Sequence, residues 1–211
     1  MSIAALLLAA GESTRMGRLK QLLEWEGEPL IAWQARQLRD AGADMVTVVL
    51  GHASQEIRPA VPDFASVVVN QDYRQGRATS LRKGADAVDL ATEAVLILSV
   101  DQPRPAWIAR LLIERWRQER APVVSPRFSR GFGHPILVDG SLIEELRAVS
   151  DETKGLRAVI DRHVDRAASI SIANDAINVD LNTPPDYEAA LASYNRGEWQ
   201  EDVKTSSNSE V

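Results

Sequence analysis

The sequence of 211 residues contains no cysteine. This absence excludes disulfide frameworks, thiolate zinc sites, iron–sulfur clusters and cysteine nucleophiles, and it suits a reducing compartment. Long hydrophobic runs are also missing, since the longest early run, Ile3 to Ala10, is less than half of a membrane span. No basic segment precedes this run, so a secretory signal is not indicated. We therefore expect a soluble cytoplasmic protein without a membrane partner.

Positive charge is in deficit: the chain has 24 Lys and Arg against 30 Asp and Glu, a formal net charge of −6. This balance argues against a general nucleic-acid binder, although it leaves room for a local anion site. A chain of this length buries about 70% of its unfolded surface, so it needs neither disulfides nor a structural metal to be stable. We expect one domain over residues 1–196, followed by a flexible acidic tail over residues 197–211.

Short apolar runs alternate with longer amphipathic stretches along the chain. Strands are expected at Ile3–Leu8, Met45–Leu50, Ser66–Val69, Ala94–Val100, Pro122–Ser125, Ile136–Val138, Ser169–Ile172 and Ile177–Val179. Helices are expected at Pro29–Ala41, Thr79–Leu90, Arg104–Arg120, Ser141–Val149 and Pro184–Tyr194. Several strand runs are apolar throughout, as expected where helices cover both faces of a sheet. The order predicts an α/β fold with a doubly wound, mostly parallel sheet, which binds ligands at the carboxyl ends of its strands.

The segment after the first expected strand combines small residues, hydroxyls and positive charge. It reads Ala9-Ala10-Gly11-Glu12-Ser13-Thr14-Arg15-Met16-Gly17-Arg18-Leu19-Lys20. The small residues at its start allow the backbone to approach a bulky ligand, and backbone N–H groups in such a turn bind phosphate. Arg15 can fork across two phosphate oxygens, whereas Lys20 acts as a mobile point charge. The segment matches neither GxGxxG nor a P-loop. Read alone, it also fits a surface turn with solvated charges.

A second stretch, from Tyr73 to Gly84, has four basic residues and no acid. It opens an expected helix, whose first N–H groups carry partial positive charge. Arg82 and Lys83 are interpreted as solvated helix residues. Gly76, Thr79 and Ser80 are better candidates for contact with a ligand. Asn70, at the end of the preceding strand, could reach the same ligand, but an asparagine at this position also suits a turn.

Two aspartates follow expected strands. Asp101 comes after Ala94–Val100, where an unpaired carboxylate would be costly and magnesium carried by a triphosphate would compensate it. In the alternative interpretation, Asp101 caps the next helix. Asp180 comes after Ile177–Val179, and the carboxyl ends of parallel strands meet at one crevice. We therefore expect Asp101 and Asp180 to share one magnesium site.

These residues resemble the nucleotidyltransferases of the molybdopterin-cofactor type. The first stretch reads Leu8-Ala9-Ala10-Gly11-x-Ser13-x-Arg15-Met16-Gly17-x-x-Lys20-x-Leu22-Leu23, followed by Gly27-x-Pro29-Leu30. Further matches are Gly76-x-x-x-Ser80-Leu81-x-x-Gly84, Asp101-x-Pro103, Gly133-His134-Pro135 and the segment Asp180-Leu181-Asn182-Thr183-Pro184-x-Asp186. The Leu-Ala-Ala-Gly form is closer to the cytidylyltransferase members, because the guanylyltransferases tend to have a second glycine where Ala10 stands.

The resemblance implies magnesium-dependent transfer of a nucleoside monophosphate, CMP from CTP, to a phosphorylated acceptor, with release of pyrophosphate. The implied acceptor is molybdopterin cofactor. The catalytic residues it implies are Lys20, Arg15 and Asp101, the metal ligands are Asp101 and Asp180, and His134 contacts the acceptor. The implied nucleotide contacts are Leu8, Ala9, Ala10, Gly11, Ser13, Arg15, Lys20, Asn70, Gly76, Thr79, Ser80 and Asp101.

Three other functions stay open to different degrees. A cytidylyl- or uridylyltransferase acting on a sugar phosphate or polyol phosphate would share most of the motifs. A nucleotide-sensing module without catalysis would keep the glycine loop but could discard Lys20 or Asp101, and both are present. A nicotinamide-dependent oxidoreductase would share the fold class, but its GxGxxG turn is absent.

Overall fold

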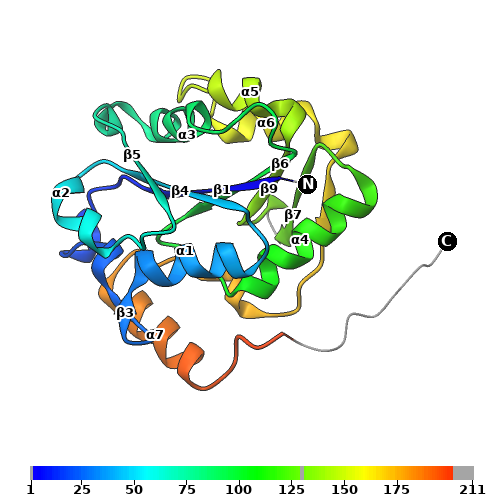
Figure 1. Ribbon diagram of the computed structural model, residues 1–211. Helices are drawn as coiled ribbons and strands as arrows, with labels where there is room; N and C mark the ends of the chain where they lie inside the picture. Colours follow the sequence, from blue (N-terminus) through cyan, green and yellow to red (C-terminus); the bar gives the residue numbers. More distant parts are fainter. Residues whose placement is uncertain (1, 129–130, 202–211) are drawn as a thin grey trace.

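The computed structural model describes residues 2–128 and 131–201, and it shows a twisted sheet between two layers of helices (Figure 1). The strand order is β10-β7-β9-β6-β1-β4-β5, and β8 pairs with β7. Strand β9 runs antiparallel to β6 and β7, whereas β6, β1, β4 and β5 are parallel neighbours. The bounds are β1 Ile3–Ala9, β4 Met45–Leu50, β5 Ser66–Val69, β6 Ala94–Ser99, β7 Val123–Phe128, β8 Gly131–Phe132, β9 Ile136–Asp139 and β10 Ala168–Ile170.

Helices cover both faces of this sheet. Figure 1 shows α3, α5 and α6 on one face and α1, α4 and α7 on the other. The bounds are α1 Leu30–Asp40, α2 Ser54–Ile57, α3 Arg77–Asp86, α4 Ala106–Glu119, α5 Ile143–Arg147, α6 Leu156–Arg162 and α7 Pro184–Asn195. The expected doubly wound, mostly parallel α/β fold is therefore confirmed.

The central strand β1 shows why its sequence is apolar throughout. Ile3, Ala5 and Leu7 belong to the core under α1 and α4, whereas Ala4 and Leu6 belong to the core under α3 and α5. Successive side chains of a strand point to opposite faces, so a strand covered on both sides needs apolar residues at every position. The two cores hold β1 rigidly, and its carboxyl end is a fixed platform for the loop that follows.

One expected strand is wrong. Residues 177–179 are not paired in the sheet: a short 3-10 helix spans Asp175–Asn178, and the side chain of Asn174 accepts a hydrogen bond from the Ala176 N–H at its start. The carbonyls of Ile177 and Val179 accept hydrogen bonds from the Arg104 guanidinium, 2.9 and 2.8 Å away. A short buried apolar run therefore satisfies its backbone with a side chain instead of a strand partner.

Several elements were not anticipated from the sequence. Helices α2 and α6 were missed, and so was the small hairpin of β2 (Glu24–Trp25) and β3 (Glu28–Pro29). The two turn residues of this hairpin, Glu26 and Gly27, both have positive φ, 53° and 78°. This geometry matches the right-handed twist of paired strands. A glutamate before the glycine is a weak sequence signal for such a turn.

The expected tail begins too early at residue 197. Trp199 is only 4% exposed, and its ring centroid lies 5.5 Å from that of Trp25 and 5.4 Å from that of Tyr194. The fold therefore continues through the segment 197–201, because an indole buried among aromatic rings is a core residue. The rest of the expected tail, residues 202–211, lies outside the described residues. Within the part of the chain that is described, no helix is long and apolar enough to cross a membrane.

Candidate functional site

The parallel strands β6, β1, β4 and β5 end at the same edge of the sheet, and three sequence motifs follow them there. The first loop, residues 10–23, follows β1, and the second loop, residues 70–76, follows β5. Asp101 stands two residues after the end of β6. The topology therefore brings both glycine-containing loops and this aspartate to one crevice, where open α/β sheets bind ligands.

The first loop has a defined backbone shape. Ser13 and Gly17, with φ values of 55° and 71°, flank a short 3-10 helix over Thr14–Met16. The side chain of Met16 is buried in the core and anchors this turn, while Arg15 is exposed. The Ser13 hydroxyl accepts a hydrogen bond from the Lys20 N–H at 3.2 Å, which closes the loop on itself.

Gln21 is a site residue that the sequence analysis missed. Its side chain is 1% exposed, and its Nε2 donates to the carbonyls of Ala9 and Gly11 at 2.8 and 3.2 Å. These bonds fix the backbone on both sides of Ala10, whose own carbonyl accepts from the His52 N–H at 3.1 Å. The carbonyls of this turn are thus directed into the protein. The only sequence signal was a polar residue between Lys20 and two leucines.

The residues predicted to contact a nucleotide at the start of this loop differ in accessibility. Leu8 and Ala9 lie in β1, and their side chains pack into the two cores. Ala10 is 6% exposed and packs against Gly51, where an added Cβ would come within 2.8 Å of the Ala10 Cβ. Gly11 is exposed, and a Cβ added there would meet nothing within 4 Å. The fold itself therefore does not require a glycine at position 11.

Lys20 and Asp101 form an ion pair across the crevice. The Lys20 ammonium lies 3.2 Å from Asp101 Oδ2, and the two side chains are 10% and 31% exposed. Nearby, Arg15 donates to Asn182 Oδ1 at 2.9 Å. Lys20 is thus directed toward the end of β6, and Arg15 toward the segment after the Asp175–Asn178 helix.

Asp180 lies beside Asp101, although no strand precedes it. The Leu181 N–H donates to the Asp101 carbonyl at 2.8 Å, and Gln102 Nε2 donates to Asp180 Oδ1 at 2.7 Å. The two residues are therefore adjacent for a different reason from the expected one. A backbone hydrogen bond between two loops places them together.

The arrangement of the two carboxylates fits a divalent metal carried by a nucleotide. Magnesium binds proteins through one or two carboxylates and takes its other ligands from phosphates and water. Each carboxylate has one hydrogen-bonded oxygen, with Lys20 or Gln102, and the second oxygen remains for another ligand. No group of three or more His, Asp or Glu side chains that could hold a metal ion occurs in residues 2–128 and 131–201. The described residues thus offer a metal two carboxylates and not a complete set of protein ligands.

Three polar residues of the second loop and α3 contact one another within the protein. Asn70 is 2% exposed, and its Nδ2 donates to Thr79 Oγ1 and Ser80 Oγ at 2.9 and 3.0 Å. Its Oδ1 accepts from the Asp72 N–H at 3.0 Å. The Thr79 hydroxyl also donates to the Gly76 carbonyl at 2.8 Å. These bonds fix the shape of the second loop, and contact of these side chains with a nucleotide stays a prediction.

The amino end of α3 is capped by the protein's own carboxylate. Asp151 accepts hydrogen bonds from the N–H groups of Arg77 and Ala78 at 3.1 and 3.0 Å. Gly76, with a φ of 139°, makes room for this carboxylate, because an added Cβ would collide with it. The partial positive charge expected to attract a ligand at this helix end is therefore already compensated by Asp151.

His134 and Arg104 are neighbours, and both lie close enough to Asp101 and Asp180 for the charges of these aspartates to affect their pKa values. Burial, and next the positive charge of Arg104, lower the pKa of His134, and its buried Nδ1 makes no hydrogen bond in the structure. Arg104 is only 3% exposed and donates to the His134 carbonyl at 3.1 Å. Burial lowers the pKa of Arg104 to about 10, although the charges of Asp180 and Asp101 oppose this change. No functional role was predicted for Arg104 from the sequence.

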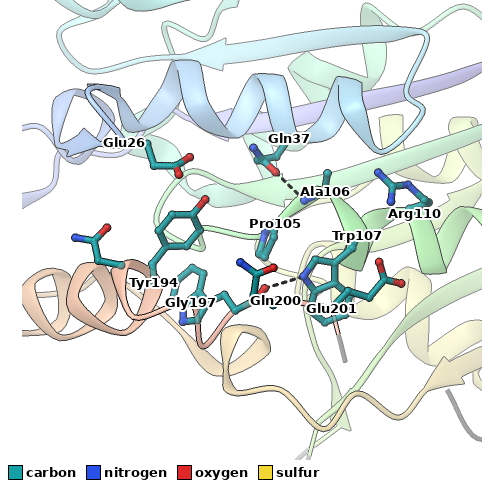
Figure 2. A pocket seen from close by; sticks show the side chains of 12 residues that line it. Glu26, Gln37, Pro105, Ala106, Trp107, Arg110, Tyr194, Gly197, Gln200 and Glu201 are labelled. Carbon is teal, nitrogen blue, oxygen red and sulfur yellow. Dashed lines mark hydrogen bonds between the residues drawn. The ribbon is translucent and has the colours of Figure 1, made fainter. Parts of the chain in front are cut away.

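A separate pocket of about 570 Å³ lies between α1, the start of α4 and the segment after α7 (Figure 2). Figure 2 shows Glu26, Gln37, Trp107 and Tyr194 around it, with Trp107 Nε1 donating to the Trp199 carbonyl at 2.9 Å. None of the site residues predicted from the sequence lines this pocket. The predicted site is an open crevice at the edge of the sheet and not this cavity.

A doubly wound sheet with a glycine loop, paired carboxylates and a lysine at its carboxyl edge defines a nucleotide-handling α/β enzyme. The chain belongs to the MobA-like NTP transferase domain family, whose model matches residues 5–167. It is therefore a nucleotidyltransferase, as the resemblance predicted.

Two relatives cover nearly the whole chain. The molybdenum cofactor cytidylyltransferase of Escherichia coli K12 is 25% identical over 92% of this chain and 97% of its own length. The nicotine blue oxidoreductase of Paenarthrobacter nicotinovorans is 28% identical over 86% of this chain and 92% of its own length. The chain also matches bifunctional GlmU proteins, of which it spans between 27% and 44% of the length in the first three relatives.

A solved structure with the same fold contains a metal. The complex of Rv0371C from Mycobacterium tuberculosis H37Rv with manganese is 25% identical, with a TM-score of 0.75, and the match covers 92% of this chain and 100% of that one. A protein of this fold and similar sequence thus binds a divalent cation.

Proposed function

We propose that the protein is a magnesium-dependent cytidylyltransferase that joins CMP from CTP to the phosphate of a molybdopterin-type cofactor. The observation that carries the proposal is the ion pair of Lys20 with Asp101, which holds the first loop against the end of β6, with Asp180 alongside. A metal-bound triphosphate needs carboxylates that bind the metal and a positive group that stabilises charge on the reacting phosphate. The two aspartates and Lys20 can supply both. The relationship to the E. coli cytidylyltransferase supports the choice of nucleotide and acceptor.

In this proposal, the first loop binds the triphosphate. The backbone at Ala10 and Gly11, the Ser13 hydroxyl and the Arg15 guanidinium supply donors to phosphate oxygens. Asp101 and Asp180 would hold Mg²⁺, which would neutralise charge on the triphosphate. Lys20 then leaves its pairing with Asp101 and contacts the reacting phosphate.

The second loop and the turn before β9 have supporting parts. Asn70, Thr79 and Ser80 maintain the loop backbone, so we assign the contact with the nucleoside to the backbone around Gly76. His134 faces the acceptor as a neutral imidazole, because burial and Arg104 both disfavour its cation.

The reaction needs little covalent chemistry from the protein. An oxygen of the acceptor phosphate attacks the α-phosphorus of CTP, a new phosphorus–oxygen bond forms, and the bond to the β-phosphate oxygen breaks as pyrophosphate leaves. A phosphate monoester is already a nucleophile, so no general base is required. Positioning of the two phosphates and stabilisation of the developing charge by Lys20 and Arg15 provide the acceleration.

A nucleotide panel tests the proposal. The protein is heated with each of the four nucleoside triphosphates, with and without Mg²⁺, and pyrophosphate release is then measured with molybdopterin cofactor or with sugar and polyol phosphates. We expect magnesium-dependent stabilisation by CTP and turnover with the cofactor. Turnover with a sugar phosphate would replace the acceptor, and binding without any turnover would indicate a nucleotide-sensing module. NADPH is a useful control, given the oxidoreductase relative: stabilisation by NADPH alone would contradict the proposal.

Base preference is the next expected result. We expect kcat/KM to be at least about tenfold higher for CTP than for GTP with one acceptor, a discrimination that a few pocket contacts provide. Ala10 occupies the position where guanylyltransferases tend to have a glycine, and it is fixed under Gly51. A clear preference for GTP would overturn the cytidylyl assignment and leave the family unchanged.

Gly11 should separate binding from stability. Its φ lies outside the left-handed region and an added Cβ meets no protein atom, so Gly11→Ala should leave the thermal midpoint unchanged or raise it slightly. The same methyl group would occupy space needed by the triphosphate, and we expect CTP affinity to fall on the order of tenfold, about 1.4 kcal/mol. Calorimetric titration and thermal unfolding measure both quantities.

Gly51→Ala is the matched opposite of this variant. Its Cβ would come within 2.8 Å of Ala10 and 2.9 Å of Tyr73, so it should lower the thermal midpoint. If Gly11→Ala instead loses stability and keeps its affinity for CTP, the first loop does not bind phosphate in the way proposed.

A further inference from the structure

Arg104 is buried, and its guanidinium donates hydrogen bonds to backbone carbonyls. Its guanidinium donates to the carbonyls of Pro103, His134, Ile177 and Val179, at 2.9, 3.1, 2.9 and 2.8 Å. Burying a guanidinium is costly, and surface positions offer the same charge without that cost. The burial of an arginine that donates to four carbonyls therefore indicates a role that a surface arginine could not perform.

These four carbonyls belong to three separate segments that meet at the crevice. Pro103 follows Asp101 after β6, His134 precedes β9, and Ile177 and Val179 lead directly to Asp180. The three segments share no sheet pairing at these residues. The planar fork of one arginine therefore connects the parts of the chain that carry Asp101, His134 and Asp180.

Arg104 is itself held firmly. Its N–H donates to Gln34 Oε1 at 3.3 Å, and Gln34 Nε2 donates to the carbonyls of Ser99 and Val100 at 3.3 and 3.0 Å. Gln34 is fully buried in α1, so the fork is anchored to both α1 and the end of β6. The segment 175–182 has no strand of its own, and this anchored fork holds it together with the hydrogen bond from the Leu181 N–H to the Asp101 carbonyl.

We propose that Arg104 is a positioning residue that sets the spacing of Asp101 and Asp180 for a divalent metal and ties the His134 turn to them. The inference rests on the proposed function, because it concerns the same metal and acceptor site. The guanidinium of Arg104 donates to backbone carbonyls and not to the carboxylate of Asp101 or Asp180. It therefore acts through the backbone that carries Asp180. Its positive charge also lowers the repulsion between two neighbouring carboxylates before a metal arrives.

Arg104→Lys tests this role, because one ammonium cannot replace a planar fork that reaches three segments. We expect weaker metal binding by on the order of tenfold or more, the usual effect of removing a partner that orients metal ligands. The probe is Mn²⁺, titrated in the presence of CTP without acceptor and followed by electron paramagnetic resonance. Affinity for CTP without metal, which depends on the first loop, should stay within about twofold.

A second readout is independent of metal and of activity. Hydrogen exchange measured by mass spectrometry should show faster exchange in residues 175–182 of the variant. Arg147→Lys is the matched control, because Arg147 of α5 also donates to two carbonyls, Ala85 and Val88, at 3.2 and 2.8 Å, but these lie at and just after the carboxyl end of α3 and not beside Asp101 or Asp180. Far-UV circular dichroism checks folding, and Arg104→Gln, which keeps two donors, is measured beside Arg104→Lys.

The outcomes separate the two proposals. If folded Arg104 variants bind Mn²⁺ with the affinity of the parent protein, Arg104 is only a structural residue and the inference is overturned, while the proposed function stands. If the parent protein shows no metal-dependent binding of any nucleoside triphosphate, the proposed function is overturned and the inference with it. Weak Mn²⁺ binding in both Arg104 variants and normal binding in Arg147→Lys is the result expected from positioning.

Discussion

Lys20→Ala is expected to lower turnover by on the order of 10²-fold or more, about 2.7 kcal/mol of transition-state stabilisation. Lys20 is 8% exposed and pairs with Asp101, so in the proposed mechanism its charge would act on the reacting phosphate away from bulk water. The variant should fold, since Asp101 is partly exposed and retains solvation when its partner is lost. Pyrophosphate release under saturating substrate measures the effect.

Lys83→Ala is the control for this variant. Lys83 is an exposed residue of α3, so its loss removes the same charge without touching the crevice. We expect its turnover to match that of the parent. Turnover of Lys20→Ala within threefold of the parent would show that Lys20 only pairs with Asp101 and takes no part in the reaction.

Asp101→Asn and Asp180→Asn should each raise the magnesium concentration needed for half-maximal turnover by on the order of tenfold. Each substitution removes one of the two carboxylates that would bind the metal. The double variant should cost less than the sum of the two in free energy, because residues that act on one ion are not independent. Turnover measured against magnesium concentration for the three variants gives the comparison.

Asp175→Asn is the matched control for these variants, because Asp175 lies five positions before Asp180 and its carboxylate accepts from Asn178 Nδ2 at 3.2 Å. It should leave the magnesium midpoint unchanged. Small and strictly additive effects of the two site variants, with an unchanged midpoint, would mean that Asp101 and Asp180 do not share an ion.

The sequence was sufficient where function and fold depend on neighbouring residues. Strand β1 is apolar throughout, and β4 and β6 each have only one polar residue, so all three are read directly as buried strands. The start of α7 was equally legible, because Thr183 and Asp186 form a capping box at positions three apart. The meeting of the first loop with Asp101 followed from parallel topology alone.

The sequence was insufficient where a side chain bonds to distant backbone. Arg104 and Val179 are 75 positions apart, and no local pattern announces a guanidinium that takes the place of a strand partner. Asn70 gives a second example, since the sequence predicts contact of this strand-end residue with a ligand but does not reveal that it donates to Thr79 and Ser80. Buried polar groups find partners inside the protein wherever the fold provides them, and composition does not reveal which.

The aromatic cluster that holds the C-terminal segment has a spectroscopic consequence. Trp25, Trp33 and Trp199 lie together around Tyr194, with Trp25 at 5.5 Å from each of the other two indoles. None of these indoles belongs to the proposed nucleotide site. Their fluorescence will therefore report whether residues 197–201 are docked on the hairpin after the first loop, and a change of their emission on heating will follow undocking of this segment rather than occupancy of the proposed site.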